Sequence, residues 1–402
     1  MKRSVLALAM LALSTSACLA DDAVKIAVLG DMSGPYSDLS GPGSVVAARL
    51  AAEDFGGQVL GKPITIISGD EQNKPDVASN LARQFYDREN VTAILDGGSS
   101  STALAIQFVS SEKKKMFLVS GGTTAEITGK SCSPYSIHWL PDTHAISTAA
   151  TRAVVADGGK SWFYITANYV FGQDLEKYSS EVVKAAGGSV LGSARAPLNT
   201  ADFSSFLLQA QGSGADVVAF ANAGSDAQTS IKQAQEFGLM GGGSKTRIVG
   251  LDIFTSDIQS IGLAVAQGVI GVADFYWDMD ETTRAWSKRF KAMHGKIPTY
   301  YQADSYSAVY NYLAAVKAAG TTDPDKVSAI MYQTPLSDPL HNGVKVRKDG
   351  RVMQPIYLMQ VKTPQESKGP DDIMKVVSKI PPEEAFIPLD KTGCPRATEQ
   401  DR

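Results

Sequence analysis

The sequence predicts an α/β protein with two doubly wound lobes, each built on a parallel sheet. A chain of 402 residues exceeds what one hydrophobic core normally organises, so two lobes are expected. Short β-rich runs alternate with helical patterns in the first half, and this rhythm restarts after a proline-containing break at residues 132–141. Alternation of strand, helix and strand indicates parallel pairing, with helices on both faces of each sheet.

The first lobe is predicted from an alternation that begins with a strand at residues 24–29. A Gly-Pro-Gly run at residues 41–43 introduces a helix over residues 44–55, and a Gly-Gly pair at residues 56–57 ends it. A second helix begins at residues 74–76, because apolar side chains then recur at i/i+4 spacing. The remaining elements expected in this lobe are strands at residues 64–67, 91–95 and 116–119 and a helix at residues 103–113.

The second lobe is predicted from the same rhythm after the break. Its expected strands are residues 162–165, 190–196, 217–220, 248–251 and 269–276, and its expected helices are residues 149–156, a helix ending at 186, 203–211 and 227–237. Two long helical patterns follow at residues 282–293 and 303–319. An Asp-Gly turn at residues 349–350 separates strands at 344–346 and 353–361. The tail after Val361 shows little periodicity until Cys394.

Two of the predicted strands run directly into loops of small and hydroxyl residues, at residues 96–102 and 120–124. A helix following the first loop would direct unpaired N–H groups and a partial positive charge at a ligand, and hydroxyl groups add further donors. Because the two strands are expected to be neighbours, the loops together predict a site for a small anionic group such as a carboxylate. The alternative is that Ser99 to Thr102 only cap the helix.

The composition and the missing motifs exclude several classes of function. The chain has 44% hydrophobic and 20% charged residues and a formal net charge of −4, and it has no basic run, so a nucleic-acid partner is not expected. Two Gly-Lys-Ser runs, at residues 129–131 and 159–161, lack the earlier glycine of a phosphate loop. No nucleophile elbow is present, and the four His share no metal-ligand spacing. The sequence therefore predicts neither an enzyme, a cofactor nor a metal site.

The first twenty residues are predicted to be a signal peptide. Lys2 and Arg3 precede an apolar run at residues 5–13 that is too short to span a bilayer, and a small-residue region leads to a cleavage site after Ala20. The alternative is lipoprotein processing at Cys18, although Thr15 is a poor fit to that signal. The mature chain is expected to be periplasmic and soluble. Only Cys132 and Cys394 then remain, and a pair in an oxidising compartment predicts a disulfide rather than two unpaired thiols.

Several short motifs are spread along nearly the whole mature chain, at residues 28–35, 61–64, 98–102, 119–124, 169–172, 199–203 and 349–351. Their order and spacing resemble the branched-chain amino acid (Leu/Ile/Val-binding) type of periplasmic solute-binding protein, which feeds ABC importers. The resemblance implies the type I periplasmic binding fold, a Venus flytrap whose lobes are joined by three crossings. By analogy, the crossings are expected near residues 139–142, 276–279 and 346–354.

The same resemblance implies limits for the lobes. Lobe 1 is expected to hold residues 21–140 and 278–348, and lobe 2 residues 141–277 and 349–362. Residues 363–402 are expected to form a C-terminal tail that returns to lobe 1.

The resemblance also implies the ligand-binding residues. Hydroxyl and small residues of the two first-lobe loops would hold the ligand carboxylate: Ser99, Ser100, Ser101, Thr102, Ser120, Gly122 and Thr123. Phe171, with Tyr169 close behind, would cover the ligand from the second lobe. In amino-acid binders an acidic residue pairs with the ligand ammonium, and Asp252 falls at that position.

Two segments depart from the amino-acid pattern. The second loop carries Gly-Gly-Thr, and Asn222 begins an Asn-Ala-Gly run where an aromatic residue is usual. Relatives with this run and a C-terminal Cys-Pro take aromatic carboxylates, and Tyr36, Phe171 and Phe254 would suit a flat ligand. The alternatives are a core role for both Phe residues, a solvated loop position for Tyr36 and a capping role for Asp252.

The function expected from these features is capture of a small carboxylate, either an amino acid or an aromatic carboxylate, in the cleft between the lobes. The chain is expected to be monomeric and to deliver its ligand to the permease subunits of an ABC transporter. The alternative is a sensor that presents its closed state to a membrane receptor.

Overall fold

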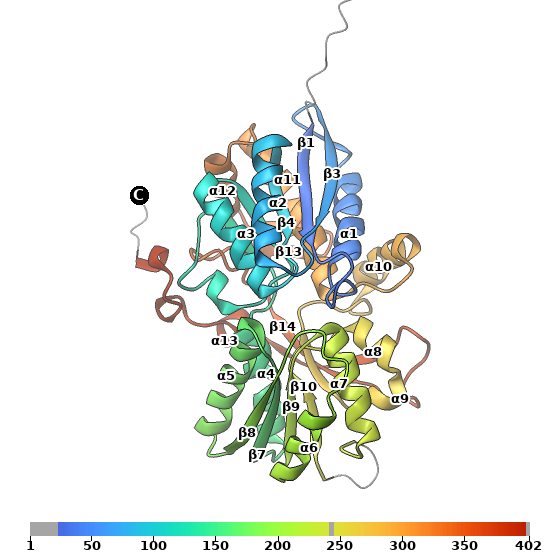
Figure 1. Cartoon of the computed structure of the whole chain (residues 1–402). Helices are drawn as coiled ribbons and strands as arrows, with labels where there is room; N and C mark the ends of the chain where they lie inside the picture. Colours follow the sequence, from blue (N-terminus) through green and yellow to red (C-terminus); the bar gives the residue numbers. More distant parts are fainter. Residues whose placement is uncertain (1–22, 241–244, 399–402) are drawn as a thin grey trace, which may run out of the picture.

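The computed structural model describes residues 23–240 and 245–398, and it shows two lobes stacked one above the other (Figure 1). The predicted signal peptide, with the alternative anchor Cys18, lies outside the described residues, and so does the predicted loop at residues 241–244. Within the described part of the chain, no helix is both long enough and apolar enough to cross a membrane.

Lobe 1 is built on a six-stranded sheet in the order β2-β3-β1-β4-β5-β6. All of its pairings are parallel except that of β2 with β3. Parallel strands bring their carboxyl ends to one edge of the sheet, so the loops after β1, β4 and β5 lie together. The strands are β1 (Val24–Gly30), β2 (Gln58–Val59), β3 (Lys62–Asp70), β4 (Val91–Asp96), β5 (Met116–Val119) and β6 (Ser136–His138).

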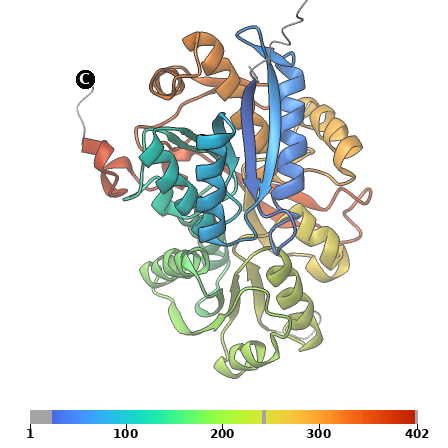
Figure 2. The same ribbon diagram turned by 45° about the horizontal axis from the view of Figure 1, so that its top comes forward.

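Helices cover both faces of this sheet, as predicted. On one face α1 (Gly41–Asp54) packs against α11 (Tyr300–Ala319), and α10 (Glu281–His294) packs beside α1. On the other face α2 (Pro75–Arg88) packs against α3 (Ser100–Lys113) over a core that includes Phe85, Ile106 and Phe117. Figure 2 shows α1 and α2 on opposite sides of the blue strands. The lobe is completed by α12 (Pro324–Gln333), β12 (Leu336–Asp338), β13 (His341–Val344) and the 3-10 turn η1 (Ala125–Ile127).

Lobe 2 contains a four-stranded parallel sheet in the order β10-β9-β7-β8. On one face α4 (Thr143–Ala156) packs against α5 (Val170–Ala185). The strands are β7 (Ser161–Ala167), β8 (Ser189–Ala196), β9 (Val217–Ala221) and β10 (Arg247–Gly250). The other helices of the lobe are α6 (Ser204–Ser213), α7 (Gly224–Glu236), α8 (Thr255–Ile261), α9 (Leu263–Ala266) and α13 (Pro382–Ala385).

A three-stranded antiparallel sheet beside the parallel one corrects the sequence analysis at the C-terminal end. β11 (Ile270–Ala273) is shorter than predicted and pairs with β14 (Ile356–Val361), which also pairs with β15 (Met374–Ile380). The arms of the Asp-Gly turn meet in an antiparallel Val346–Val352 bridge, and the Met353 N–H donates to the Lys345 carbonyl oxygen at 2.8 Å. The strands themselves lie further from the turn than predicted, because β13 ends at Val344 and pairs with β12, and β14 begins at Ile356. The tail after Val361 is therefore not irregular throughout, since β15 adds a strand to lobe 2.

The chain passes between the lobes three times, between β6 and α4, between β11 and α10, and between β13 and β14. The three passages meet at Gln354, whose amide Nε2 donates to the Trp139 carbonyl oxygen at 3.2 Å, to Asp274 Oδ2 at 2.5 Å and to Asp304 Oδ1 at 3.3 Å. All four residues are buried. The Gln354 amide, in the third passage, is thus bonded to the first passage and to the second at the hinge.

The predicted disulfide is confirmed. Cys132 and Cys394 are bonded, with Cα atoms 5.6 Å apart and 262 positions between them in sequence. The chain-entropy model gives roughly 5 kcal/mol of stabilisation for a loop of that length.

Candidate functional site

A cavity lies between the two lobes, at the carboxyl edge of the lobe 1 sheet. The space among its lining residues measures about 240 Å³, counted to its open edge. Only about 10 Å³ of this space admits the centre of a water-sized sphere, so the side chains nearly fill the cavity in this arrangement. The lining residues are Tyr36, Leu39, Gly98, Ser99, Ser100, Gly121, Thr123 and Tyr301 from lobe 1 and Tyr169, Phe171 and Ala223 from lobe 2.

The loops after β4 and β5 form one wall of this cavity and are bonded to each other. The Thr124 N–H donates to Ser100 Oγ at 3.1 Å, and the Ser120 N–H donates to the Asp96 carbonyl oxygen at 3.2 Å. Ser99 is the N-cap of α3, so Ser100 lies in its first turn, three residues before the predicted helix start. The positive end of the α3 dipole therefore faces the cavity.

Several backbone donors in these two loops have no protein acceptor. Within the described residues, no hydrogen bond is formed by the N–H groups of Ser100, Gly121, Gly122 and Thr123, although all four residues are buried. Buried N–H groups without a partner are rare in folded proteins. Converging free N–H groups at a helix N-terminus form an anion-binding concavity.

Four of the predicted carboxylate residues do not line the cavity. Thr102 turns into the protein, where its Oγ1 accepts from the Ser99 N–H at 2.9 Å and donates to the Gly97 carbonyl oxygen at 2.6 Å. Ser120 Oγ is bonded to Ser305 Oγ at 2.8 Å inside lobe 1. Ser101 is half-buried and lies outside the cavity lining, as does Gly122. Thr102 therefore caps α3, which is the alternative to ligand binding given for this residue.

Aromatic side chains form the opposite wall. Tyr36, Phe171 and Tyr301 are buried, and the ring centroids of Tyr169 and Phe171 lie 5.8 Å apart. The hydroxyl groups of Tyr36 and Tyr169 are 2.8 Å apart and form a hydrogen bond between the lobes. Burial raises the pKa of the Tyr36 phenol above its usual range, so both hydroxyls stay protonated and available as hydrogen-bond donors. Tyr36 is therefore not the solvated loop residue of the alternative reading.

Asp252 lies behind this aromatic wall and does not line the cavity. Tyr300 donates its hydroxyl to Asp252 Oδ1 at 2.7 Å, whereas the buried Oδ2 has no partner among the described residues. Burial raises the pKa of Asp252 to about 7, and the Tyr300 hydrogen bond opposes that rise. A cationic or donor group that reached Oδ2 would satisfy it.

The other two predicted second-lobe residues also lie behind the lining. Phe254 is buried and stacks on Tyr300, with centroids 4.9 Å apart and an interplanar angle of 5°. Asn222 is buried and donates its Nδ2 to Ser230 Oγ at 3.1 Å, while its neighbour Ala223 reaches the cavity. Both residues therefore support the wall from behind.

Buried carboxyl groups organise the loops beneath the cavity. Asp31 accepts from the N–H groups of Gly34 at 2.6 Å and Tyr36 at 2.9 Å, which fixes the loop that carries Tyr36. Burial raises the pKa of Asp96 to about 6. Glu71 is fully buried, and neither carboxyl oxygen has a partner among the described residues.

The location of Glu71 connects it to the cavity. A Cβ built on Gly98, a cavity residue, would lie 2.0 Å from Glu71 Oε1, so the carboxyl packs directly under the cavity floor. Burial first, and then the charges of Asp31, Asp96 and Asp70, raise the pKa of Glu71 to about 9. Glu71 is thus a neutral acid at neutral pH.

The lobes touch each other around the cavity. The Ser225 N–H donates to the Pro35 carbonyl oxygen at 3.2 Å, and Thr124 Oγ1 donates to Asp174 Oδ2 at 2.6 Å. Gly224 has a φ of +60°, and a Cβ at this position would lie 2.3 Å from the Pro35 carbonyl oxygen. These contacts join the two lobes directly and give a closed arrangement.

Five lining residues were missed by the sequence analysis: Leu39, Gly98, Gly121, Ala223 and Tyr301. Gly98 and Gly121 belong to the loops that were identified, so the loop composition was a usable signal for them. Tyr301 is the second residue of α11, far along the chain, and no local pattern marks it. No group of three or more His, Cys, Asp or Glu in the described ranges has the geometry to hold a metal ion.

Comparison with known proteins identifies relatives over most of the chain. A family model described as periplasmic binding protein matches residues 23–370. A Leu/Ile/Val-binding protein homolog 6 of Brucella melitensis is 27% identical over 263 residues, which cover 65% of this chain and 66% of that relative. The match thus spans just under two thirds of the length of that curated relative.

Two solved structures extend the comparison. A periplasmic binding protein of Burkholderia mallei is 43% identical with a TM-score of 0.90, and the match covers 93% of this chain and 99% of that one. A solute-binding protein of an ABC transporter from Rhodopseudomonas palustris, solved with 3,4-dihydroxybenzoic acid, shares the fold at 22% identity and a TM-score of 0.81. That match covers 90% of this chain and 98% of that one.

Proposed function

Because the chain belongs to the periplasmic binding protein family, we propose that it captures a small carboxylate, either an amino acid or an aromatic carboxylate, in the cavity between its lobes. Proteins of this family bind solutes for ABC transporters and are not enzymes. The bound ligand would contact both lobes and so stabilise the closed arrangement over open ones.

One observation carries the proposal: the buried N–H groups of Ser100, Gly121, Gly122 and Thr123 have no acceptor among the described residues. A carboxylate supplies two oxygens with several lone pairs, which matches a group of unpaired donors in two adjoining loops. The hydroxyl groups of Ser99, Ser100 and Thr123 line the same wall and add donors to it.

The two ligand classes make different use of the opposite wall. An aromatic carboxylate would lie among Tyr36, Tyr169, Phe171 and Tyr301. The solute-binding protein solved with 3,4-dihydroxybenzoic acid is compatible with this class. An α-amino acid would need an anion for its ammonium group, and Asp252 Oδ2 is an unpartnered buried candidate. The Leu/Ile/Val-binding relatives are compatible with this second class.

We also propose that the protein is exported by its N-terminal signal, acts as a monomer in the periplasm and passes its ligand to the permease subunits of an ABC transporter. The lobe limits of the sequence analysis fit this proposal, with the three passages between the lobes serving as the hinge.

A thermal-shift screen of the mature protein against α-amino acids and aromatic carboxylates tests the proposal. A ligand that binds only the folded protein stabilises it by mass action and so raises its melting temperature. At a ligand concentration of a hundred times Kd, the added free energy of unfolding is about 2.7 kcal/mol. Stabilisation by at least one carboxylate is expected, whereas amide or alcohol analogues of the same compound should give none. Equal stabilisation by a carboxylate and its amide would contradict carboxylate recognition.

Thr123→Ala tests the carboxylate wall directly. Loss of one hydrogen bond to a charged group costs about 1.5–3 kcal/mol, so calorimetry should show a Kd at least tenfold higher. The melting temperature of the ligand-free protein should change little, because no backbone donor depends on this hydroxyl. Ser100→Ala should lower both the ligand affinity and the melting temperature, because Ser100 Oγ also accepts the Thr124 N–H. The exposed Thr334→Ala serves as a control, and an unchanged Kd for Thr123→Ala would remove Thr123 from the site.

A further inference from the structure

The segment after β15 connects the two lobes a fourth time, in addition to the three hinge passages. We define the C-terminal strap as residues 381–394, which follow β15 and end at the disulfide. In Figure 1 this red segment runs along the junction between the upper and lower lobes. Its two ends are fixed to different lobes.

The first end of the strap is fixed to lobe 2. It continues directly from β15, which is paired with β14 along its whole length. α13 then packs against α4, and the Ala385 carbonyl oxygen lies 3.1 Å from His144 Nδ1 of that helix.

The strap next contacts the third hinge passage. Phe386 is buried beneath the guanidinium of Arg351, whose Cζ lies 4.8 Å from the ring centroid. Arg347 Nη1 donates to the Ile387 carbonyl oxygen at 2.9 Å. Arg351 is itself fully buried and bonded to Asp142 in the first passage at 3.2 Å. The strap is therefore packed onto the hinge as well as onto lobe 2.

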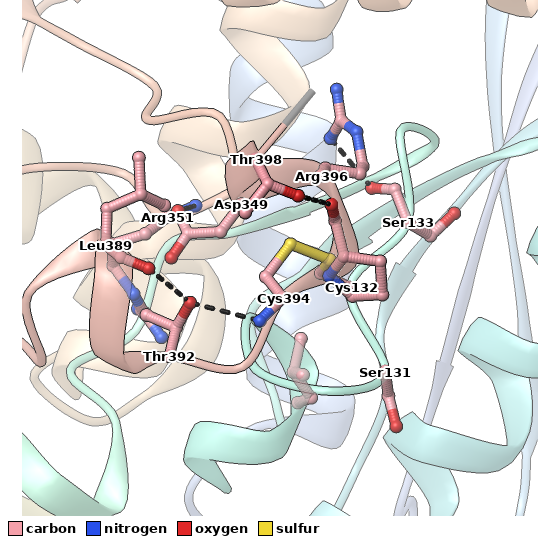
Figure 3. The surroundings of a disulfide bond; sticks show 12 residues. Ser131, Cys132, Ser133, Asp349, Arg351, Leu389, Thr392, Cys394, Arg396 and Thr398 are labelled. Carbon is pink, nitrogen blue, oxygen red and sulfur yellow. Dashed lines mark hydrogen bonds between the residues drawn. A yellow bond between two sulfur atoms is a disulfide. The ribbon is translucent and has the colours of Figure 1, made fainter. Parts of the chain in front are cut away.

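The second end of the strap is fixed to lobe 1, most firmly by the Cys132–Cys394 disulfide (Figure 3). Just beyond the strap, Arg396 Nη1 donates to the Tyr332 hydroxyl at 2.7 Å, and its guanidinium lies over the same ring. Tyr332 belongs to α12 of lobe 1. The disulfide is the covalent component of this anchor.

Between these anchors the strap has little support of its own. Residues 387–393 are half-buried or exposed, and they hold a single 3-10 turn, η2 (Leu389–Lys391). Thr392 Oγ1 links Leu389 and Cys394 within the same segment. Seven residues reach at most about 25 Å when fully extended. Because both ends are held, this length limits how far the lobes can move relative to each other.

We propose that the C-terminal strap, locked by the Cys132–Cys394 disulfide, restricts the range of lobe orientations that the ligand-free protein can adopt. Domain closure in hinge proteins occurs through a few residues that absorb the backbone rotation. The three passages provide that hinge, and the strap adds a covalent limit beside it.

Small-angle X-ray scattering of ligand-free protein tests the proposal, after bound ligand has been removed in urea without reductant and the protein refolded. Cys132→Ala/Cys394→Ala should increase the radius of gyration and broaden the distance distribution. A second variant keeps the disulfide and inserts six Gly/Ser residues between Pro388 and Leu389, which adds up to about 20 Å of slack. It should give the same broadening, because the anchor is intact but the strap is longer.

The insertion variant separates the strap from ordinary stabilisation by a disulfide. Its melting temperature should stay near that of the unaltered protein, whereas the double Cys variant should melt lower. The same six residues inserted between Ala186 and Gly187, an exposed turn within lobe 2, are the control and should leave the scattering unchanged. Scattering from the strap insertion that matches this control would overturn the proposal and leave the disulfide a purely stabilising bond.

Discussion

At the scale of single residues, Glu71 is a carboxyl group under the cavity whose pKa is raised by burial. Its carboxyl is buried without a hydrogen-bond partner among the described residues and faces three other acids. With a folded-state pKa of about 9 against about 4.5 unfolded, the folded state binds the extra proton. The contribution of Glu71 to stability is thus fully present below pH 4.5 and is lost as the pH rises toward 9.

Glu71→Gln should therefore flatten the pH dependence of unfolding, because the amide resembles the neutral acid and cannot ionise. At pH 5 the variant and the unaltered protein should have similar free energies of unfolding, measured by urea denaturation. At pH 8 the variant should be more stable by at least about 1.4 kcal/mol, the equivalent of one pKa unit. Glu181→Gln, at an exposed position, is the control. Parallel pH curves for all three proteins would refute this account of Glu71.

Asp252→Asn distinguishes the two proposed ligand classes. An α-amino acid whose ammonium pairs with Asp252 needs the ionised carboxyl, so its affinity should fall as the pH drops from 8 to 6 through the pKa of about 7. In the Asn variant that affinity should drop at least tenfold and lose its pH dependence, because the ion pair is gone. Benzoate should bind both proteins equally. Calorimetry at three pH values measures this, and amino-acid binding that survives in the variant would exclude Asp252 as the ammonium partner.

The sequence could identify the types of residue in the carboxylate wall, but not which of them face the cavity. Ser99, Ser100 and Thr102 lie in one loop, and their directions depend on where α3 starts and on its helical phase. The start lies three residues earlier than the apolar pattern indicates, because the first turn holds hydroxyl residues. Thr102 therefore comes to the N3 position of a capping box and turns inward.

At the scale of elements, Thr102 and Ser101 provide a matched pair within the first turn of α3. Thr102→Ala removes the acceptor for the Ser99 N–H and should cost about 1 kcal/mol of stability, as for other capping residues. Ser101→Ala should leave both stability and ligand affinity nearly unchanged, because this side chain lies outside the cavity lining. Thermal melting and calorimetry on both variants check this. A large loss of affinity in Ser101→Ala would return Ser101 to the ligand site.

Element prediction found the buried strands and missed β15. The β-rich runs of β4, β5, β7 and β9 were found because their side chains are almost all buried. β15 was missed because six of its seven residues are exposed or half-buried, so the strand carries no apolar alternation. β15 forms because it pairs with β14, and the local sequence of neither strand shows that pairing. α4 was shortened for a related reason, since its first turns bury Thr143, Ser147 and Thr148.

At the scale of the whole molecule, the contact of Gly224 with Pro35 controls how closely the lobes approach. An Ala Cβ at position 224 would lie 2.3 Å from a backbone oxygen of the other lobe, so the clash is relieved only by separating the lobes. Gly224→Ala should therefore expand the protein in small-angle scattering and raise the ligand Kd more than tenfold.

The control for this variant is Gly187→Ala. Gly187 also has a positive φ, of +78°, but a Cβ there would meet nothing within 4 Å. Both variants carry the strain of an Ala at positive φ, and only Gly224→Ala carries the clash between lobes. If the two variants scatter alike and bind alike, the lobe contact at Gly224 has no part in closure.

The two-lobed architecture was predictable from the chain length and the alternation of strands and helices, but the contacts between the lobes were not. Tyr36 and Tyr169 bond to each other across 133 positions of sequence, and no spacing rule relates them. No spacing rule predicts the bonds of Gln354 either, which join three passages that are far apart in the chain. Such contacts depend on the final orientation of two folded units, which single-sequence patterns do not contain.

The position of the two cysteines also sets an order of events during synthesis. Cys132 leaves the ribosome 262 residues before its partner Cys394. The thiol of Cys132 must therefore stay unreacted, or react only reversibly, until those residues have followed it. Completion of the bond consequently reports that Cys394 has been made and has reached Cys132, so a product that stops before Cys394 would carry a free Cys132 that distinguishes it chemically from the bonded protein.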